Sequence, residues 1–164
     1  MLAAWLTLDN TGDRKLDDLI RDLAQRYSAP VFRPHITVLG GIDLTPSRLA
    51  GLTDAVFKTV APFRVRPVAL CQTADIWRTV IIELAASEEL AQINRHLVQL
   101  ARPPVIKPFA PHISLLYKKL QPEIRARIVS GITIDAEYRV TGAALVDIGG
   151  PVENWQIRKH YLFD

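Results

Sequence analysis

Two of the four histidines lie in six-residue segments that are nearly identical. Residues 34–39 read PHITVL, and residues 111–116 read PHISLL. Side chains alternate across a strand, so if each segment is a strand, its imidazole and the hydroxyl two positions later share one face. Two such strands side by side would place two imidazoles and two hydroxyls in one cleft. These four side chains are His35, Thr37, His112 and Ser114.

This set of side chains suits acid–base chemistry on a phosphate ester. An imidazole has an unperturbed pKa of about 6.5, so at neutral pH one ring can be neutral and act as a base while the other is protonated and acts as an acid. Hydroxyl groups can donate hydrogen bonds to the non-bridging oxygens of a phosphate, and a protonated imidazole offsets its charge. Pro34 and Pro111 fit the first position of a strand, where a missing N–H is tolerated.

Two other kinds of hydrolytic site fit the sequence less well. A zinc hydrolase usually has three protein ligands and one open position. The chain has no His-Glu-x-x-His segment, no pair of cysteines and no obvious carboxylate beside either repeated segment. A Ser-His-Asp site would need a nucleophile elbow, whereas Ser114 lies two positions from His112 on an extended strand. We therefore expect no metal and no cofactor.

Three aromatic residues are candidates for contacts with a substrate. Tyr117 follows the second segment, and strict alternation turns it away from His112 unless the strand bends or ends there. Trp77 begins a run with strand character, where an indole stacked on a base would contribute roughly 1–3 kcal/mol. Trp155 is a similar candidate near the C-terminus, and for all three the alternative is simple packing. Trp5 alternates with apolar neighbours and is expected in the core.

Apolar periodicity and turn residues predict the elements that hold these side chains. Helices are predicted over residues 13–27, 45–60, 87–101 and 122–130. Strands are predicted over residues 2–8, 34–39, 63–73, 76–84, 111–116, 132–136, 138–148 and 155–163. The runs 63–73 and 76–84 indicate an antiparallel hairpin near the middle of the chain.

The order of these elements predicts an α+β fold with mostly antiparallel sheets and helices on the outer faces. The two repeated segments lie 77 positions apart (112 − 35), close to half of the chain. This spacing indicates two similar lobes that face each other across a cleft. The boundary is expected within the central hairpin, without a flexible linker, so residues 1–164 would form a single bilobal domain.

Composition narrows the class of protein further. Hydrophobic residues make up 49% of the 164, which is enough for a sizeable core and argues against disorder. The formal charge of +3 suits an anionic substrate but is too small to indicate binding of long nucleic acids. The single cysteine, Cys71, allows no intrachain disulfide, and the N-terminal apolar run lacks the basic start of a signal peptide. We expect a cytoplasmic monomer with no membrane partner.

The paired His-x-Thr and His-x-Ser segments resemble the signature of the 2H phosphoesterase superfamily. The sequences Pro-His-Ile-Thr-Val and Pro-His-Ile-Ser-Leu-Leu-Tyr are most similar to those of the cyclic nucleotide phosphodiesterase branch of that superfamily, known from plants and yeast. The resemblance extends over most of the chain and includes the N-terminal strand with Trp5 and the strand near Trp155.

This resemblance implies a bilobal 2H phosphoesterase domain with pseudo-twofold symmetry that needs no metal. Such enzymes open nucleoside 2′,3′-cyclic phosphates to 2′-phosphates, or ADP-ribose 1″,2″-cyclic phosphate to the 1″-phosphate. Carried over to this sequence, His112 is the base that activates water and His35 is the acid that protonates the departing oxygen. Thr37 and Ser114 bind the phosphate. The expected partner is a small cyclic nucleotide or ADP-ribose cyclic phosphate.

Two alternative functions stay open at the level of sequence. The first is an RNA-processing enzyme that acts on RNA ends, an RNA 2′,3′-cyclic phosphodiesterase that resembles the 2′-5′ RNA ligase branch. A broad basic groove would favour it, but the basic residues are scattered: Arg64, Arg66, Lys118 and Lys119. The second is a nucleotide-binding module without catalysis, which the two intact segments argue against.

Overall fold

The computed structural model describes residues 1–164 and contains four α-helices, eight strands and two 3₁₀ turns. The helices are α1 (Asn10–Tyr27), α2 (Pro46–Phe57), α3 (Glu88–Ala101) and α4 (Pro122–Ser130). The strands are β1 (Leu2–Leu8), β2 (Ile36–Ile42), β3 (Phe63–Val65), β4 (Pro67–Gln72), β5 (Val80–Leu84), β6 (His112–Leu116), β7 (Tyr138–Asp147) and β8 (Gln156–Leu162). The 3₁₀ turns are η1 (Ile76–Arg78) and η2 (Val152–Asn154).

All strands belong to one sheet in which every paired neighbour is antiparallel. The order is β3-β7-β1-β2-β6-β5-β4, and β8 also pairs with β7. Two halves of the sheet meet between β2 and β6, where Ile36 is paired with Ile113. Each isoleucine directly follows a histidine of a repeated segment, so this junction brings His35 and His112 together. That the whole chain forms one bilobal domain stays a prediction.

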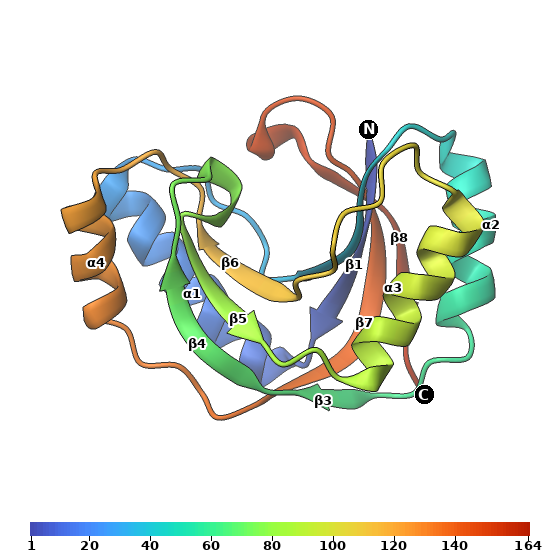
Figure 1. The fold of residues 1–164 in the computed structure, drawn as a ribbon, viewed down its shortest axis with the longest axis horizontal. Coiled ribbons are helices and arrows are strands. Elements are labelled where there is room, and N and C mark those ends of the chain that lie inside the picture. The colour runs from blue at the N-terminus through green and yellow to red at the C-terminus, as the bar shows by residue number, and fades with distance from the viewer.

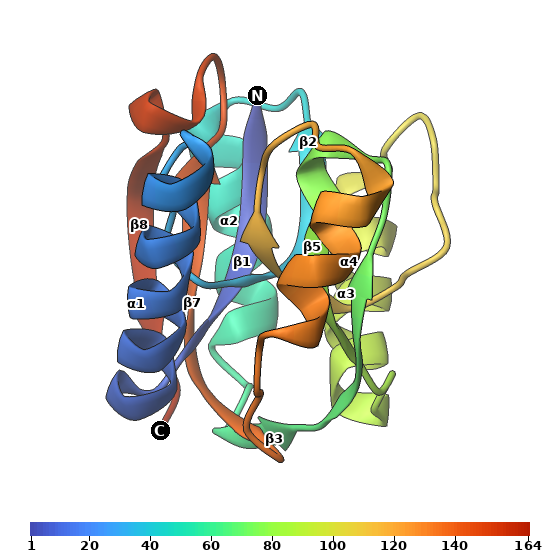
Figure 2. The same cartoon turned by 90° about the vertical axis from the view of Figure 1, so that its left-hand side faces the viewer.

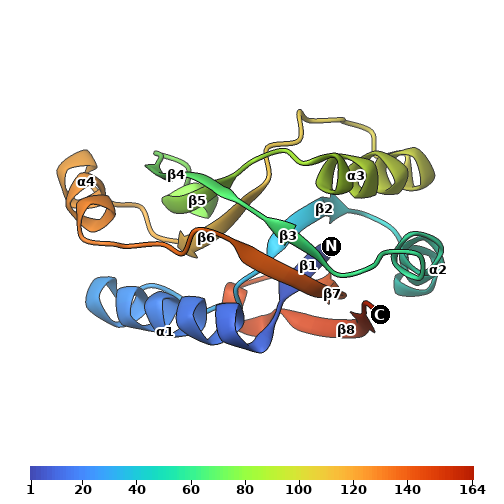
Figure 3. The same cartoon turned by 90° about the horizontal axis from the view of Figure 1, so that it is seen from below.

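The helices cover the sheet in two pairs. Helix α1 packs on β6 and β1 and helix α4 packs on β4 and β5, whereas α2 and α3 pack on each other and on strands of the other half. Figure 1 shows α1 and α4 at one side of the molecule and α2 and α3 at the other, with the curved sheet between them. Figures 2 and 3 show the same arrangement from one side and from below. The predicted α+β fold with helices outside is confirmed.

The helices form where amphipathic spacing and capping residues coincide. In α1 the buried residues include Leu16, Ile20 and Leu23, which lie on one face at helical spacing. The side chain of Asp9 accepts a hydrogen bond from the Gly12 amide at 2.8 Å, so this helix begins at Asn10, three residues before the predicted start. No helix combines the length and the apolar composition that crossing a bilayer requires.

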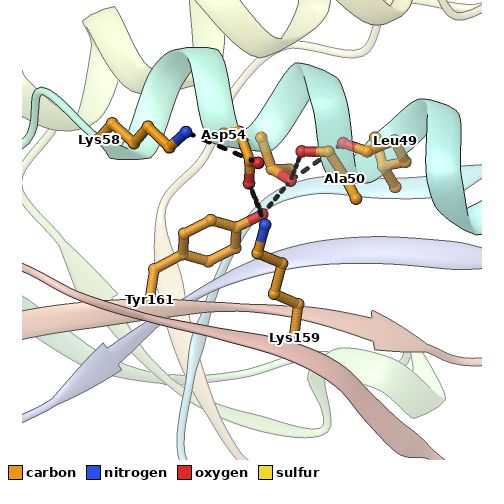
Figure 4. A network of polar contacts seen from close by, with 7 residues as sticks. Leu49, Ala50, Asp54, Lys58, Lys159 and Tyr161 are labelled. Atoms are coloured by element: carbon orange, nitrogen blue, oxygen red, sulfur yellow. Dashed lines mark hydrogen bonds and ion pairs between the residues drawn. The ribbon is translucent and has the colours of Figure 1, made fainter.

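A polar network fastens β8 to α2 (Figure 4). Asp54 accepts hydrogen bonds from the Lys159 ammonium at 2.5 Å and from the Tyr161 hydroxyl at 2.7 Å. The Tyr161 hydroxyl also lies 2.7 Å from the Thr53 hydroxyl. The Lys159 hydrogen bond, helped by Tyr161, lowers the pKa of Asp54, so the carboxylate stays ionised. The network therefore holds β8 in place, and Trp155 lies just before the start of that strand.

Two predicted strands are wrong in the centre of the chain. Residues 63–73 form two strands, because the chain crosses at Arg66 from one half of the sheet to the other: β3 pairs with β7 and β4 pairs with β5. Residues 76–78 form the turn η1, since Asp75 accepts a hydrogen bond from the Trp77 amide at 3.0 Å and starts a 3₁₀ turn. The antiparallel pairing of β4 with β5 confirms the rest of the hairpin.

The predicted strand over residues 132–136 is also wrong. Ile132 and Ile134 pack against the core, which explains the alternating pattern, but no neighbouring strand pairs with them. An alternating apolar pattern requires only that one face is buried, and a strand needs a hydrogen-bonded partner as well.

Candidate active site

A cavity with a volume of about 390 Å³ lies at the junction of the two halves of the sheet. All seven site residues predicted from the sequence line this cavity: His35, Thr37, Trp77, His112, Ser114, Tyr117 and Trp155. The two repeated segments therefore contribute to one site, as the alternation of side chains predicted.

The two imidazoles are held in the same way. Nδ1 of His35 lies 2.7 Å from the Arg33 carbonyl oxygen, and Nδ1 of His112 lies 2.8 Å from the Ala110 carbonyl oxygen. A carbonyl can only accept, so each Nδ1 carries the proton when the ring is neutral. Each bond reaches back across a proline to the residue two positions earlier. In both rings Nε2 is therefore the nitrogen that can take up or release a proton.

The two histidines differ in their surroundings. His35 is buried, with 5% of its surface exposed, and its ring stacks on the Trp5 indole with centroids 3.7 Å apart and planes 13° apart. Burial lowers the pKa of His35 to about 4, although the Arg33 carbonyl opposes this change. His112 is less buried, and burial together with the positive charge of Arg78 lowers its pKa. Both imidazoles are therefore neutral at neutral pH in the protein alone.

The stacked Trp5 is the residue that breaks the symmetry between the two halves. Trp5 on β1 pairs with Thr37, and Ile81 on β5 pairs with Ser114, so Trp5 and Ile81 occupy equivalent positions. An indole thus flanks one segment where an isoleucine flanks the other. Trp5 is buried as predicted, but it also lines the cavity. The sequence pattern could not indicate this contact, since it depends on the register between β1 and β2.

Tyr117 reaches the cavity because β6 ends at Leu116, so strict alternation no longer applies to it. The phenol ring stacks on Phe32 with centroids 3.9 Å apart. Burial raises the pKa of Tyr117 to about 12, and a hydrogen bond with Ser114 opposes the rise. The phenol therefore stays protonated and can donate a hydrogen bond at neutral pH.

Two tryptophans from opposite halves of the sheet meet over the cavity. Trp77 belongs to η1, and Trp155 lies between η2 and β8. Their ring centroids are 6.0 Å apart, with an angle of 26° between the planes. Trp77 is half exposed, and the indole nitrogen of Trp155 is buried without a hydrogen-bond partner. An exposed indole at the rim of a cavity offers a free face for a base.

Sequence reasoning missed Arg78, which also lines the cavity. Its run has the composition of a strand, and no pattern around it marks a functional residue. Arg78 also lines a second cavity of about 670 Å³, which shares Thr37, Gly40 and His112 with the first. The second cavity is walled by β2, by α3 and by residues 103–110, the segment that extends away from the sheet in Figure 2. The two cavities thus form one continuous site.

The chain contains no cluster of three or more histidine, cysteine, aspartate or glutamate side chains placed to hold a metal ion. The repeated segments bring two imidazoles and two hydroxyls to the cavity, and Tyr117, directly after the second segment, adds a phenol.

Comparison with known proteins identifies the family. A family model described as the 2′-5′ RNA ligase superfamily matches residues 6–151, most of the chain. The chain belongs to this superfamily. The resemblance to 2H phosphoesterases found in the sequence is therefore confirmed.

Individual proteins that resemble this chain share little sequence identity with it. A cyclic phosphodiesterase from Arabidopsis thaliana is 21% identical over 121 residues, which cover 74% of this chain and 67% of that protein. E. coli LigT in its apo form has a TM-score of 0.63 at 16% identity, and the alignment covers 99% of this chain and 96% of LigT. TT0787 of Thermus thermophilus has a TM-score of 0.62 at 17% identity, covering 99% of this chain and 97% of TT0787. These structures establish the fold, and the family supports phosphoesterase activity.

Proposed function

We propose that this protein hydrolyses cyclic phosphodiesters without a metal ion. The substrates are nucleoside 2′,3′-cyclic phosphates, opened to 2′-phosphates, or ADP-ribose 1″,2″-cyclic phosphate, opened to the 1″-phosphate. The observation that carries the proposal is the convergence of two equivalent imidazoles, each with Nδ1 bound to a carbonyl and Nε2 left for chemistry. The relationship to a plant protein named cyclic phosphodiesterase agrees with it.

The chemistry needs one base and one acid. Nε2 of one histidine takes a proton from water while the water oxygen attacks phosphorus. The bond from phosphorus to one ring oxygen breaks, and Nε2 of the other histidine gives a proton to that oxygen. The Thr37 hydroxyl has no hydrogen bond within the chain and is free to donate to a non-bridging oxygen.

The roles proposed for the two histidines follow the resemblance, with His112 as the base and His35 as the acid. An acid must be protonated before it can act, and burial keeps His35 neutral in the protein alone. The acid role therefore requires that the bound phosphate raises the pKa of His35, because a nearby negative charge favours the imidazolium. The roles of the two rings can be separated by experiment.

The activity is tested by incubating the protein with 2′,3′-cyclic nucleotides in the presence of EDTA and identifying the product by NMR. We expect a 2′-phosphate. His35→Ala and His112→Ala should each lower kcat by about 10²–10⁴-fold, the usual contribution of a positioned proton donor or acceptor. His96→Ala is the matched control, since His96 is exposed on α3. A 3′-phosphate product, activity that chelation abolishes, or full activity of both variants would contradict the mechanism.

The acid is identified by a substrate in which sulfur replaces the departing 3′ oxygen. A thiolate leaves without being protonated, so the variant that lacks the acid recovers much of its rate on this substrate and the variant that lacks the base does not. We expect the recovery in His35→Ala. Recovery in His112→Ala instead would reverse the two roles.

The size of the site favours a second candidate function, the opening of cyclic phosphates at RNA ends. The second cavity continues past His112 and has more volume than the first, which leaves room for a nucleotide beyond the reacting phosphate. E. coli LigT, in contrast, has been crystallised with the small nucleotides 3′-AMP, ATP and NADP⁺, which agrees with small nucleotide ligands. A trinucleotide cyclic phosphate that reacts far faster than its mononucleotide would establish the RNA-end function.

A further inference from the structure

Arg78 lies where the two cavities meet. It is the last residue of η1 and shares the walls of both cavities with Thr37 and His112. Its positive charge is close enough to His112 to lower the pKa of that imidazole. A cation at this point therefore faces the same space as the proton-transferring nitrogen of His112.

The guanidinium of Arg78 lacks the carboxylate partner that several arginines of this chain have. Five arginines form ion pairs with carboxylates: Arg21, Arg26, Arg64, Arg95 and Arg158. Arg78 forms none, and its Nε is buried without any hydrogen-bond partner. A buried N–H without a partner costs free energy, roughly 1–3 kcal/mol. The guanidinium of Arg78, which lines both cavities, therefore has no anionic partner within the chain.

Hydrogen bonds fix the backbone around Arg78, and one of them ties η1 to β6, the strand that begins with His112. The Ser114 hydroxyl donates to the Trp77 carbonyl at 3.0 Å. The Thr79 hydroxyl donates to the Lys118 carbonyl at 2.8 Å, and the Thr73 hydroxyl donates to the Arg78 carbonyl at 2.8 Å. The backbone is thus held on both sides of Arg78 and at Arg78 itself.

The same contacts leave the His112 side of the site short of a hydroxyl donor. Ser114 is the equivalent of Thr37, but its proton is committed to the Trp77 carbonyl, whereas the Thr37 hydroxyl is free. A phosphate between the two imidazoles would then receive a hydroxyl hydrogen bond on the His35 side alone. A guanidinium supplies the missing donors on the other side together with a positive charge, which strengthens such bonds.

We propose that Arg78 is a catalytic residue whose guanidinium binds a non-bridging oxygen of the phosphate on the His112 side and stabilises the negative charge that builds up during attack. This inference rests on the proposed phosphodiesterase function. The turn η1, which lies outside both repeated segments, would then supply a permanently charged group, the guanidinium, that neither repeated segment contains.

The first test compares Arg78→Gln with Arg125→Gln in the hydrolysis of a 2′,3′-cyclic nucleotide. Arg125 lies on α4, binds Gln72 through Nε at 2.7 Å and lines neither cavity, so its removal changes the net charge equally. We expect Arg78→Gln to lower kcat/KM by about 10²–10³-fold, as when a preorganised donor to the transition state is removed. We expect Arg78→Lys to recover part of the loss. Equal activity of the two glutamine variants would overturn the proposal.

The second test does not depend on turnover. The pKa of His112 is followed by NMR in the wild type and in Arg78→Gln, while the other charged groups that influence His112, Asp75 and Glu83, stay unchanged. We expect the pKa of His112 to rise in the variant, because a like charge has been removed. Binding of inorganic phosphate, measured in the same titrations, should weaken at least about tenfold in Arg78→Gln and remain unchanged in Arg125→Gln.

The two tests separate the inference from the function on which it rests. If the wild type opens no cyclic phosphate, the proposed function fails, and the role of Arg78 is judged by phosphate binding. Weaker phosphate binding in Arg78→Gln would then still support an anion site at Arg78, and unchanged binding would overturn it.

Discussion

Replacing His35 with asparagine should make the stability of the protein less sensitive to acid. The imidazole is buried, stacked on Trp5, and its pKa is lowered from 6.5 to about 4. Between these two values the unfolded chain binds a proton at this residue and the folded protein does not. The free energy of unfolding therefore falls as the pH falls from 6.5 towards 4, and it does not change at this residue well above 6.5.

The size of the effect follows from the two pKa values. Protonation of the unfolded chain at this one residue destabilises the folded protein by about 0.2 kcal/mol at about pH 7 and by about 2.6 kcal/mol at about pH 4.5. An asparagine does not titrate, and its amide can donate to the Arg33 carbonyl in place of Nδ1. Between about pH 7 and about pH 4.5, the free energy of unfolding of His35→Asn should therefore fall by roughly 2.4 kcal/mol less than that of the wild type.

The measurement is urea unfolding of both proteins at the two pH values, with His96→Asn as the control for an exposed histidine. Any constant cost of the substitution cancels, because only the change with pH is compared. The burial of His112 lowers stability in acid in the same direction, but it contributes to both proteins. Parallel pH dependence in the wild type and His35→Asn would refute the reasoning, since it would mean that His35 is protonated as readily in the folded state as in the unfolded chain.

Two further predictions concern the surroundings of His35 and the packing of the sheet. Trp5→Ile places on β1 the residue type that Ile81 provides at the equivalent position of β5. This substitution should raise the pKa of His35, measured by NMR, because water then reaches the imidazole, whereas Trp77→Ile should leave that pKa unchanged. Gly142→Ala should destabilise the protein by about 1–3 kcal/mol in thermal unfolding, since its Cβ would lie 2.4 Å from the Tyr161 carbonyl oxygen. Gly51→Ala, which meets open space on α2, should instead stabilise it by up to about 1 kcal/mol.

Much of the fold could be predicted because each element has a local cause. Thr45 and Ser87 cap their helices as their types suggest, and each accepts a hydrogen bond from an amide three residues later. The prediction of strands failed where hydrogen-bonded pairing with another strand decides whether a segment is a strand. Ile132 and Ile134 alternate like a strand but have no partner, and the run over residues 63–73 divides because its two parts pair with different strands.

The sequence by itself determined which side chains can do chemistry. The period of two in a strand puts His35 with Thr37 and His112 with Ser114, and the repetition of the segment indicates that the two sets work together. The pairing of each imidazole with its hydroxyl needs only local geometry, whereas the contact of β2 with β6 brings the two sets into one cavity.

The tertiary structure decided how the two halves of the site differ. The stacking of Trp5 on His35 depends on the register of β1 against β2, and the position of Arg78 beside His112 depends on a turn anchored to β6. Tyr117 enters the cavity only because its strand ends one residue earlier. Burial and proximity of charge arise from contacts between residues far apart in the chain, and these contacts set the protonation of two histidines that the sequence presents as equals.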